Sequence, residues 1–381
     1  MARVVLAMSG GVDSSVAAKL LIDAGHEVIG VFMRHGEASA AVCAVPEVDA
    51  ANGASGTSGL PVVDATPTRK DHRQGCCTAS DAADARRVAA AMDIPFYALD
   101  LKDDFSRIVD NFVDDYLSGR TPNPCVRCNQ WIKFGRLFDY ADGVDAEFVA
   151  TGHYARMRFD DGDASLHRGV DDRKDQSYAL FGIRRDRLSR MLLPVGDYEK
   201  PQIREIAASL NLGVANKKDS QEICFVTQGH HSEFIRGKAP QRSADTDGEF
   251  VLTDGTVVGR HGGFEAFTVG QRKGLGIALG KPAFVVRVEP DTARVVLGDR
   301  DALLRRELTA DQANWLIDPA DLPPRVQVQI RYNSPPYPAS VEVFAGHRFG
   351  VRFDDPQEAV APGQAAVVYD GTRVLGGGWI E

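Results

Sequence analysis

Apolar runs and helical repeats alternate along the first part of the chain. Arg3–Met8 is a short apolar run, and the apolar residues after it recur at helical spacing from Val16 to Ala24. Gly25 ends this predicted helix, and Glu27–Met33 forms the next buried run. A strand, a loop, a helix and a second strand in this order are the unit of a parallel sheet.

The same alternation resumes after an interruption. Residues 36–75 are rich in Ala, Gly, Ser, Thr, Pro and Val without a helical or strand period, so we interpret them as a mobile insertion. The segment Gly119–Cys128 contains Pro122 and Pro124 and is predicted to be irregular. The other segments predict an α/β domain with a doubly wound parallel sheet: helices over Thr78–Met92, Asp103–Leu117 and Asn129–Tyr140, and strands over Phe96–Leu101 and Ala146–Thr151.

The pattern changes in the second half. Two short helices are predicted over residues 184–212, and beyond about residue 245 Gly, Pro and Asp separate short β-rich runs. These runs predict an all-β region that ends in a small barrel: Glu249–Leu252, Thr256–Gly259, Ala283–Glu289, Arg294–Leu297, Val326–Tyr332, Ser340–Phe344, Ala365–Tyr369 and Val374–Ile380. We therefore predict a catalytic α/β domain over 1–228, a small central β domain over 229–275 and a C-terminal β-barrel over 276–381.

Composition narrows the class of protein. Hydrophobic residues make up 44% of the 381 residues and charged residues 25%, which excludes a wholly disordered chain. No stretch approaches the ~20 apolar residues of a membrane span, and the N-terminus is typical of a first strand rather than a signal peptide, so we expect a cytoplasmic protein without a membrane partner. The net charge of −9 means that any nucleic-acid binding needs a local basic face.

The loop Ser9–Ser14, read Ser-Gly-Gly-Val-Asp-Ser, lies between the first strand and the first helix. Glycines let backbone N–H groups approach phosphate oxygens, and the helix N-terminus adds positive potential. The loop has neither the lysine of a Walker loop nor the glycine spacing of a dinucleotide site. Asp13 would repel phosphates unless a divalent cation lies between them, which implies Mg²⁺. The alternative is an ordinary helix N-cap with glycine turn residues.

Six cysteines are present, and in a cytoplasmic chain of this size they are unsuited to a disulfide framework. Cys125 and Cys128 form a C-x-x-C pair, but no second C-x-x-C or H-x-x-x-H completes a zinc site. Reactive thiols or a metal site are the better interpretations. The cysteines are Cys43, Cys76, Cys77, Cys125, Cys128 and Cys224.

Ser9–Ser14 resembles the signature of the PP-loop ATP pyrophosphatases, which have an adenine nucleotide alpha hydrolase-like fold and split ATP between its α and β phosphates. Nearly the whole chain is similar to the tRNA-specific 2-thiouridylases (MnmA family). Further blocks that carry this resemblance, in order along the chain, are Thr121–Asn129, Thr151–Tyr154, Lys174–Ser177, Asp219–Cys224, Phe267–Gly276, Ile330–Tyr332 and Pro362–Gln364.

The resemblance implies roles for named residues. Cys128 would be the nucleophile, Cys224 would carry the incoming persulfide, and the two would end as a disulfide bond. The implied ATP-binding residues are Ala7, Met8, Ser9, Gly10, Gly11, Val12, Asp13, Ser14, Met33 and Gly152. The residues that match tRNA-contacting positions are Asn123, Pro124, Cys125, His153, Lys174, Asp175, Gln176, Arg331, Tyr332 and Gln364. For His153, a histidine packed for structure is the alternative.

The implied reaction is that of a tRNA-uridine 2-sulfurtransferase. The C2 carbonyl of uridine is a poor electrophile, so ATP adenylates the C2 oxygen of the wobble uridine at position 34. Sulfur from a cysteine persulfide then displaces AMP, which gives 2-thiouridine, AMP and pyrophosphate. Thiolates are the reactive forms, and the stacked uridine must be splayed out of the anticodon loop. A cysteine desulfurase or a sulfur-relay protein would supply the persulfide.

Cys125 departs from the family pattern, because many members have Asp at this position. With Cys128 and Cys224 it offers three thiolates, which could instead hold a [4Fe–4S] cluster that binds the extra sulfur. The persulfide relay is the preferred hypothesis, without a resident metal, and the cluster is the alternative.

The predicted tRNA-facing surface is the helical segment 184–212 and its flank. Residues 184–218 include eight basic and four acidic residues. The barrel adds Arg325, Arg331, Arg348 and Arg352. Three rival functions remain open: another PP-loop synthetase or ligase, a non-catalytic nucleotide- or RNA-binding protein, and a thioredoxin-like redox protein. The eight basic residues are Arg184, Arg185, Arg187, Arg190, Lys200, Arg204, Lys217 and Lys218.

Overall fold

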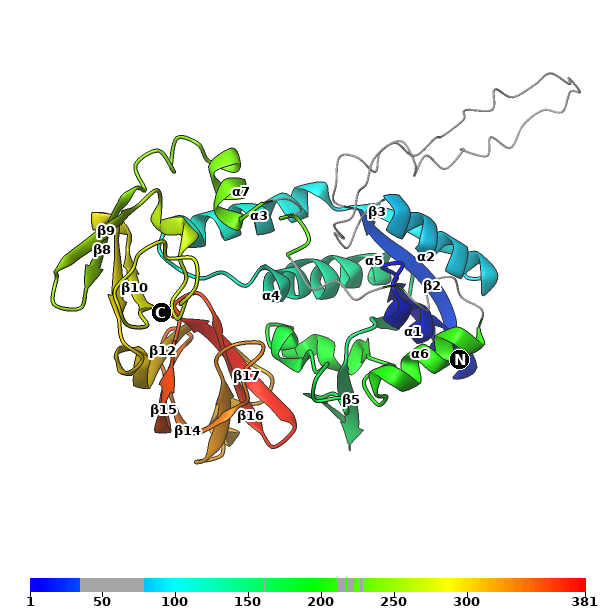
Figure 1. Ribbon diagram of the computed structural model, residues 1–381. Helices are drawn as coiled ribbons and strands as arrows, with labels where there is room; N and C mark the ends of the chain where they lie inside the picture. The colour runs from blue at the N-terminus through cyan, green and yellow to red at the C-terminus, as the bar shows by residue number, and fades with distance from the viewer. Residues whose placement is uncertain (35–78, 161, 211–216, 218–222, 227–228) are drawn as a thin grey trace, which may run out of the picture.

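The computed structural model describes residues 1–34, 79–160, 162–210, 217, 223–226 and 229–381. The predicted insertion 36–75, three of the cysteines (Cys43, Cys76 and Cys77) and Lys218 lie outside these described residues, as do residues 219–222 of one family block. Figure 1 shows an α/β body at the N-terminal end of the chain and two β-rich bodies toward the C-terminus.

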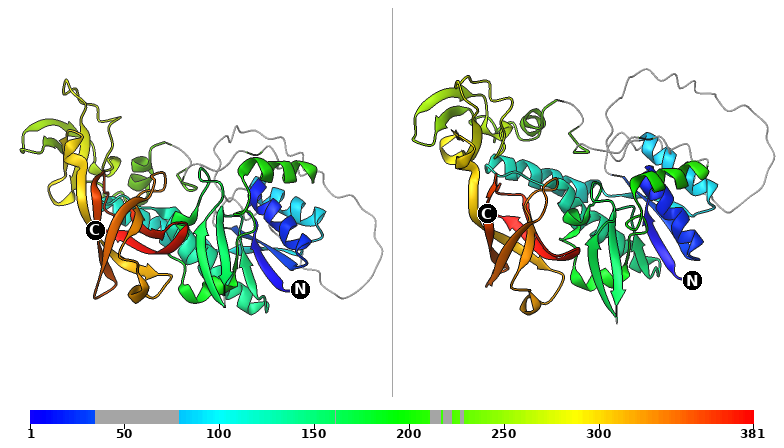
Figure 2. Two further views of the ribbon diagram at one scale, coloured as in Figure 1. Left: turned by 90° about the horizontal axis from the view of Figure 1, so that it is seen from below. Right: turned by 60° about the horizontal axis from the view of Figure 1, so that its bottom comes forward.

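The α/β body is built on a five-stranded parallel sheet in the order β3-β2-β1-β4-β7. Its helices cover both faces, which confirms the predicted doubly wound fold (Figures 1 and 2). The strands are β1 (Arg3–Ala7), β2 (Glu27–Arg34), β3 (Phe96–Asp100), β4 (Phe148–Ala150) and β7 (Met191–Leu192).

Alternation along the central strand β1 explains the two layers. Val4 and Leu6 pack into a core with helices α1, α2 and α6, whereas Val5 and Ala7 pack on the opposite face against α5. Both sets of side chains are buried, as expected for a strand in the middle of a parallel sheet. The helices of this body are α1 (Val12–Asp23), α2 (Ala79–Ala91), α3 (Lys102–Leu117), α5 (Leu137–Gly143) and α6 (Lys200–Ser209).

The prediction that Gly119–Cys128 is irregular is wrong at the C-terminal end of this segment. Helix α4 (Pro124–Cys128) begins inside it and runs on without a break through the π-helical η2 (Asn129–Arg136) into α5. Pro124 is tolerated because it occupies the first turn, where its missing N–H is not needed. Asn123 caps the helix, since its side-chain oxygen accepts a hydrogen bond from the Val126 N–H at 3.3 Å.

Only one of the two helices predicted over 184–212 is an α-helix. The stretch opens with the 3₁₀ helix η4 (Arg185–Arg190), which leads into β7, and α6 follows with Pro201 in its first turn. Glu199 and Gln202 form a capping box at the start of α6.

A four-stranded sheet follows, in the order β10-β11-β8-β9. Helix α7 (His231–Lys238) precedes it. Two of its strands, β10 and β11, lie beyond residue 276, where the predicted C-terminal domain begins; the domain boundaries stay a prediction. The strands are β8 (Gly248–Leu252), β9 (Val257–His261), β10 (Phe284–Glu289) and β11 (Arg294–Gly298).

The C-terminal body is a closed antiparallel barrel, as predicted. The strands follow the order β12-β15-β14-β13-β16-β17, and β17 pairs back onto β12. The hairpin of β5 (Ala155–Asp160) and β6 (Asp163–Arg168) extends this sheet from the α/β body, with Arg373 opposite His167. The barrel strands are β12 (Leu304–Trp315), β13 (Val326–Gln329), β14 (Tyr337–Phe344), β15 (Arg348–Glu358), β16 (Ala365–Asp370) and β17 (Arg373–Ile380).

No helix in the described part of the chain is both long and apolar enough to span a membrane.

We expect Leu6→Ala to lower the free energy of unfolding of the α/β body by about 2–5 kcal/mol, because it opens a cavity beside the central strand. Leu304→Ala is the matched control, since Leu304 is 36% exposed in the barrel whereas Leu6 is fully buried. Urea unfolding followed by circular dichroism compares the two variants. Equal losses of stability would contradict the central position of β1.

Candidate active site

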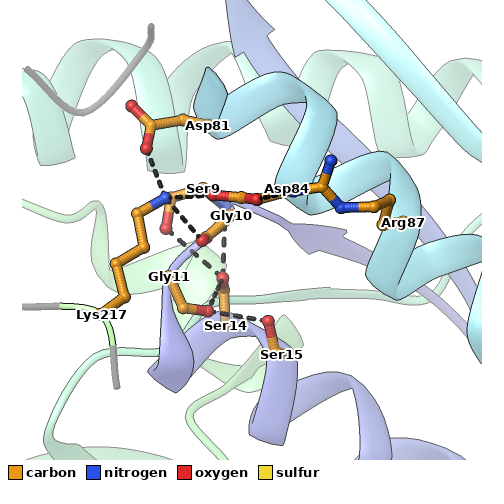
Figure 3. A network of polar contacts seen from close by, with 9 residues as sticks. All are labelled: Ser9, Gly10, Gly11, Ser14, Ser15, Asp81, Asp84, Arg87 and Lys217. Atoms are coloured by element: carbon orange, nitrogen blue, oxygen red, sulfur yellow. Dashed lines mark hydrogen bonds and ion pairs between the residues drawn. The ribbon is translucent and has the colours of Figure 1, made fainter. Parts of the chain in front are cut away.

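The loop Ser9–Ser14 follows β1 at the carboxyl edge of the parallel sheet and continues into α1. Its hydroxyl groups hold its own backbone: Ser14 Oγ donates to Gly11 O at 3.2 Å and accepts from the Ser9 N–H at 3.3 Å. Ser15 Oγ donates to the same carbonyl at 2.8 Å (Figure 3). The loop is therefore folded before any ligand arrives, at the edge where ligands bind in open α/β sheets.

Two glycines allow other segments to approach this loop closely. Gly10 has φ +71°, and a Cβ atom there would lie 2.2 Å from the Asp81 carbonyl oxygen at the start of α2. A Cβ atom on Gly152, which follows β4, would lie 2.8 Å from the Ser14 nitrogen. The predicted nucleotide-binding residues Ala7–Ser14 and Gly152 are thus adjacent in space, and only glycine fits at these two positions.

Asp13 has protein partners that the sequence did not indicate. Lys200 Nζ lies 2.8 and 2.9 Å from the two carboxylate oxygens, and the Tyr154 hydroxyl donates to one of them at 2.7 Å. The predicted Mg²⁺ between Asp13 and the phosphates stays a prediction, and the structure places the buried ammonium of Lys200 on the same carboxylate. Lys200 is therefore wrongly counted in the predicted basic face, because its charge points inward to the loop.

Lys217 does not belong to the predicted basic face either. Its ammonium donates to the Gly10 carbonyl at 3.0 Å, to Asp81 at 2.5 Å and to Asp84 at 2.8 Å, which joins the loop to α2 (Figure 3). Burial opposes its charge, but the two carboxylates outweigh burial and raise the pKa of Lys217. No local sequence pattern marks these contacts, since Lys217 and its partners are far apart along the chain.

Cys128 and Cys224 pack against one small hydrophobic cluster. Leu101, Phe105, Ile108 and Ile132 form this cluster, and Met33 at the end of β2 packs against it as well. Cys128 lies on α4 and Cys224 lies far along the chain, so the fold brings the two predicted thiols to the same place. The cluster also contacts Met33, one of the predicted nucleotide-binding residues.

Cys125 is in a different environment. Its side chain is exposed, whereas Cys128 and Cys224 are half-buried, and in the described part of the chain all three are thiols rather than disulfide partners. Among the described residues, no three His, Cys, Asp or Glu side chains are grouped closely enough to hold a metal ion. Exposure thus sets Cys125 apart from Cys128 and Cys224.

Several of the residues predicted to contact tRNA hold the site together. The carboxylate of Asp175 accepts hydrogen bonds from the N–H groups of Gly169 and Ser177, and burial raises its pKa. Gln176 accepts from the Tyr154 N–H at 2.9 Å, and Gln364 Nε2 donates to the carbonyls of Thr121 and Pro122. Contact of these residues with tRNA stays a prediction.

The other residues predicted to contact tRNA lie in the barrel or near Cys125. Tyr332 is 42% exposed; burial of its hydroxyl raises its pKa, and the nearby charges of Asp175 and Cys125 add to this shift. Arg331 Nη2 donates to the Glu358 carbonyl at 3.2 Å. Lys174 is half-exposed, and Asn123 and Pro124 begin α4. Asp175, Tyr332 and Cys125 thus lie near one another although they come from distant parts of the sequence.

His153 is buried beside the loop. Its Nδ1 lies 2.7 Å from the Thr151 hydroxyl, and burial holds its pKa well below the ordinary value, with Lys133 adding to the effect. The imidazole is therefore neutral at physiological pH. This environment suits the packed, structural histidine that we named as the alternative, and contact with tRNA stays a prediction.

Three family matches together cover nearly the whole chain. Residues 2–60 and 56–228 match the "tRNA methyl transferase HUP domain", 233–299 match the "tRNA methyl transferase PRC-barrel domain", and 305–380 match the "Aminomethyltransferase beta-barrel domain".

Individual relatives match over their full length. A protein of Rhodopirellula baltica named tRNA-specific 2-thiouridylase MnmA is 65% identical over 386 residues, which cover 100% of this chain and 96% of the relative. A protein of the same name from Moorella thermoacetica is 45% identical, with 99% and 98% covered. Among solved structures, a 4-thiouridine synthetase–RNA complex with bound ATP is 14% identical, with a TM-score of 0.36, and covers 63% of this chain and 51% of its own.

We expect Lys200→Met to weaken ATP binding by roughly tenfold or more, because the Asp13 carboxylate would then face the phosphates without its buried partner. Adding Asp13→Asn to Lys200→Met should recover part of the affinity, since it removes the uncompensated charge. Calorimetric titration with a non-hydrolysable ATP analogue measures both effects. Lys19→Met is the control, because Lys19 pairs with Asp23 at the exposed end of the same helix α1.

Proposed function

The chain belongs to the MnmA family of tRNA-specific 2-thiouridylases, and we propose that it replaces the C2 oxygen of a tRNA uridine with sulfur in the site described above. It is a tRNA sulfurtransferase. The observation that carries the assignment of the site is the shared environment of Met33, Cys128 and Cys224 on one cluster at the edge of the nucleotide-binding sheet. A PP-loop synthetase or ligase without sulfur chemistry does not need two thiols at that place.

The first step activates the uridine. The loop Ser9–Ser14 binds the phosphates of ATP, and the C2 oxygen of uridine 34 attacks the α phosphate. The bond between the α and β phosphates breaks, pyrophosphate leaves, and the C2 oxygen becomes part of an adenylate that can depart as AMP. The uridine enters this site splayed out of the anticodon loop, because a stacked base exposes no C2 oxygen to the α phosphate.

The second step transfers sulfur. The terminal sulfur of a persulfide on Cys224 attacks C2, and AMP leaves with the electrons of the C2–O bond. The Cys128 thiolate then attacks the Cys224 sulfur and breaks the sulfur–sulfur bond, which leaves 2-thiouridine and a disulfide between Cys128 and Cys224. A cellular thiol reductant restores the pair, and a cysteine desulfurase or sulfur-relay protein reloads Cys224. The common cluster beneath both thiols supports a reaction that uses the two thiols together.

Two inorganic groups are candidates for this site. Mg²⁺ is proposed as the companion of the ATP phosphates and enters with the nucleotide. Lys200 and Tyr154 contact the Asp13 carboxylate in this structure, so a role of Asp13 toward Mg²⁺ stays part of the proposal. The persulfide relay is the proposed route, and a [4Fe–4S] cluster on Cys125, Cys128 and Cys224 stays the alternative.

Binding of tRNA uses the rim of the site. Asp175 and Cys125 both act on Tyr332, and Arg184, which precedes η4, has a guanidinium that is 72% exposed beside Asp186. Exposed ion pairs of this kind are worth little, so phosphates can take over the arginine. Such contacts predict binding that falls steeply with salt. We propose that the enzyme meets its tRNA in the cytoplasm.

We expect Cys224→Ser to abolish 2-thiouridine formation while tRNA-dependent release of pyrophosphate continues, because the serine cannot carry a persulfide. Cys128→Ser should form the persulfide on Cys224 and stall after it. Nucleoside mass spectrometry measures the product, and peptide mass spectrometry measures the persulfide. Normal product from either variant would contradict the relay.

Cys125→Ser tests the alternative cluster separately. The relay predicts that sulfur transfer survives this substitution, whereas a cluster on three cysteines predicts loss of product together with loss of iron and sulfide from anaerobically purified enzyme.

A further inference from the structure

The loop that precedes Cys128 is fastened to the C-terminal barrel as well as to its own domain. The Thr121 N–H donates to the Pro362 carbonyl at 2.7 Å, and Gln364 returns two hydrogen bonds to the carbonyls of Thr121 and Pro122 at 3.0 and 3.2 Å. Arg120 adds a hydrogen bond to the Ile380 carbonyl at 3.3 Å. A proline-rich loop with few backbone bonds of its own is thus held from outside.

Arg127 extends this attachment into the helical turn that carries the thiols. It lies between Cys125 and Cys128 in α4, and its side chain is buried. The guanidinium carbon lies 3.9 Å from the ring centroid of Trp379 and 5.1 Å from that of Trp131. Trp379 belongs to β17 of the barrel, so this stacking joins the two bodies directly.

The hydrogen bonds of the same guanidinium reach both bodies. Nη1 donates to Gln130 Oε1 at 3.3 Å within the helix, and Nη2 donates to Gln312 Oε1 at 3.1 Å in β12. A planar fork that stacks on a ring and donates at its edges has one orientation, whereas a lysine ammonium would not. These contacts therefore fix the orientation of the Arg127 side chain as well as its distance from the barrel.

Burial of this cation is energetically unfavourable, which argues against a role in stability alone. Desolvation lowers the pKa of Arg127 to about 10, although Asp115 and Asp311 oppose the shift, and the group stays charged at neutral pH. An apolar side chain of similar size would fill the space between two tryptophans without this penalty. What an apolar residue lacks is the charge that offsets Asp115 and Asp311, and the directional hydrogen bond to Gln312.

We propose that Arg127 is a positioning residue for sulfur transfer, which fixes the Cys125–Cys128 turn against Trp379 and Gln312 of the barrel. The inference rests on the proposed function, because it gives the barrel a part in placing the Cys128 thiolate. The barrel then contributes to the chemistry without touching the reacting atoms.

The test compares Arg127→Lys with Arg168→Lys. Arg168 is a matched control: its guanidinium lies 4.5 Å from the Tyr369 ring, it donates to Gln329 Oε1 at 2.8 Å, and it too joins the α/β body to the barrel. It differs in being attached to the hairpin strand β6 instead of the thiol turn. The full-length enzyme is treated with iodoacetamide without ATP or tRNA, and peptide mass spectrometry follows alkylation of Cys128.

We expect Arg127→Lys to speed the alkylation of half-buried Cys128 by about threefold or more, because a loosened turn exposes the thiol more often. The kcat of thiolation should fall by roughly ten- to a hundredfold while the KM for ATP stays unchanged. Arg168→Lys should lower the melting temperature by about as much as Arg127→Lys does. It should leave the alkylation rate of Cys128 as in the wild type.

A second variant approaches the same tie from the barrel. Gln312 has φ +49°, a conformation that asparagine tolerates, so Gln312→Asn shortens the amide without straining the backbone. It should repeat the faster alkylation of Cys128. Unchanged alkylation in both Arg127→Lys and Gln312→Asn, or an equal increase in Arg168→Lys, would overturn the proposal. Failure of the proposed function is distinguishable, because it would show as wild-type enzyme that makes no 2-thiouridine.

Discussion

One hydrophobic core shared by the α/β body and the barrel supports the active site. Tyr178 and Phe181 from the α/β body pack in the same cluster as Val367, Tyr369 and Trp379 from the barrel, and the Tyr178 hydroxyl donates to the Ala365 carbonyl at 3.0 Å. Because this core is continuous, the two bodies have little freedom to shift against each other. Every polar contact between residues 120–128 and the barrel depends on that fixed arrangement.

Electrostatic balance is the second constraint on the site. A loop proposed to bind phosphates must avoid a bare carboxylate, yet Asp13 lies within it and Asp81 and Asp84 lie beside it. Lys200 and Lys217 neutralise these groups from distant parts of the chain. Both lysines pair with carboxylates at the loop. The surface therefore carries fewer unpaired positive charges than a count of basic residues in the sequence indicates.

The sequence was informative where the structure depends on local pattern. Strands β1 and β2, the loop Ser9–Ser14 and the closed barrel follow from periodicity, glycine spacing and the punctuation of short apolar runs. The start of α4 was mispredicted because Pro124 was taken only as a helix breaker, although proline is favoured in a first turn. Lys200 and Lys217 were misassigned because long-range ion pairs leave no mark on their neighbours. The same holds for Arg127, whose partners Trp379 and Gln312 are found only once the barrel is folded.

The attachment of the thiol loop to β17 also has a consequence for biosynthesis. The ribosome makes residues 120–128 long before it makes Trp379 and Ile380, and N-terminal domains generally fold first during synthesis. A nascent chain can therefore complete its nucleotide loop while the turn that bears Cys128 still lacks its outer support. The contacts of Arg120 with Ile380 and of Arg127 with Trp379 can form only after β17 has been made, so the final geometry of this turn is set late in synthesis.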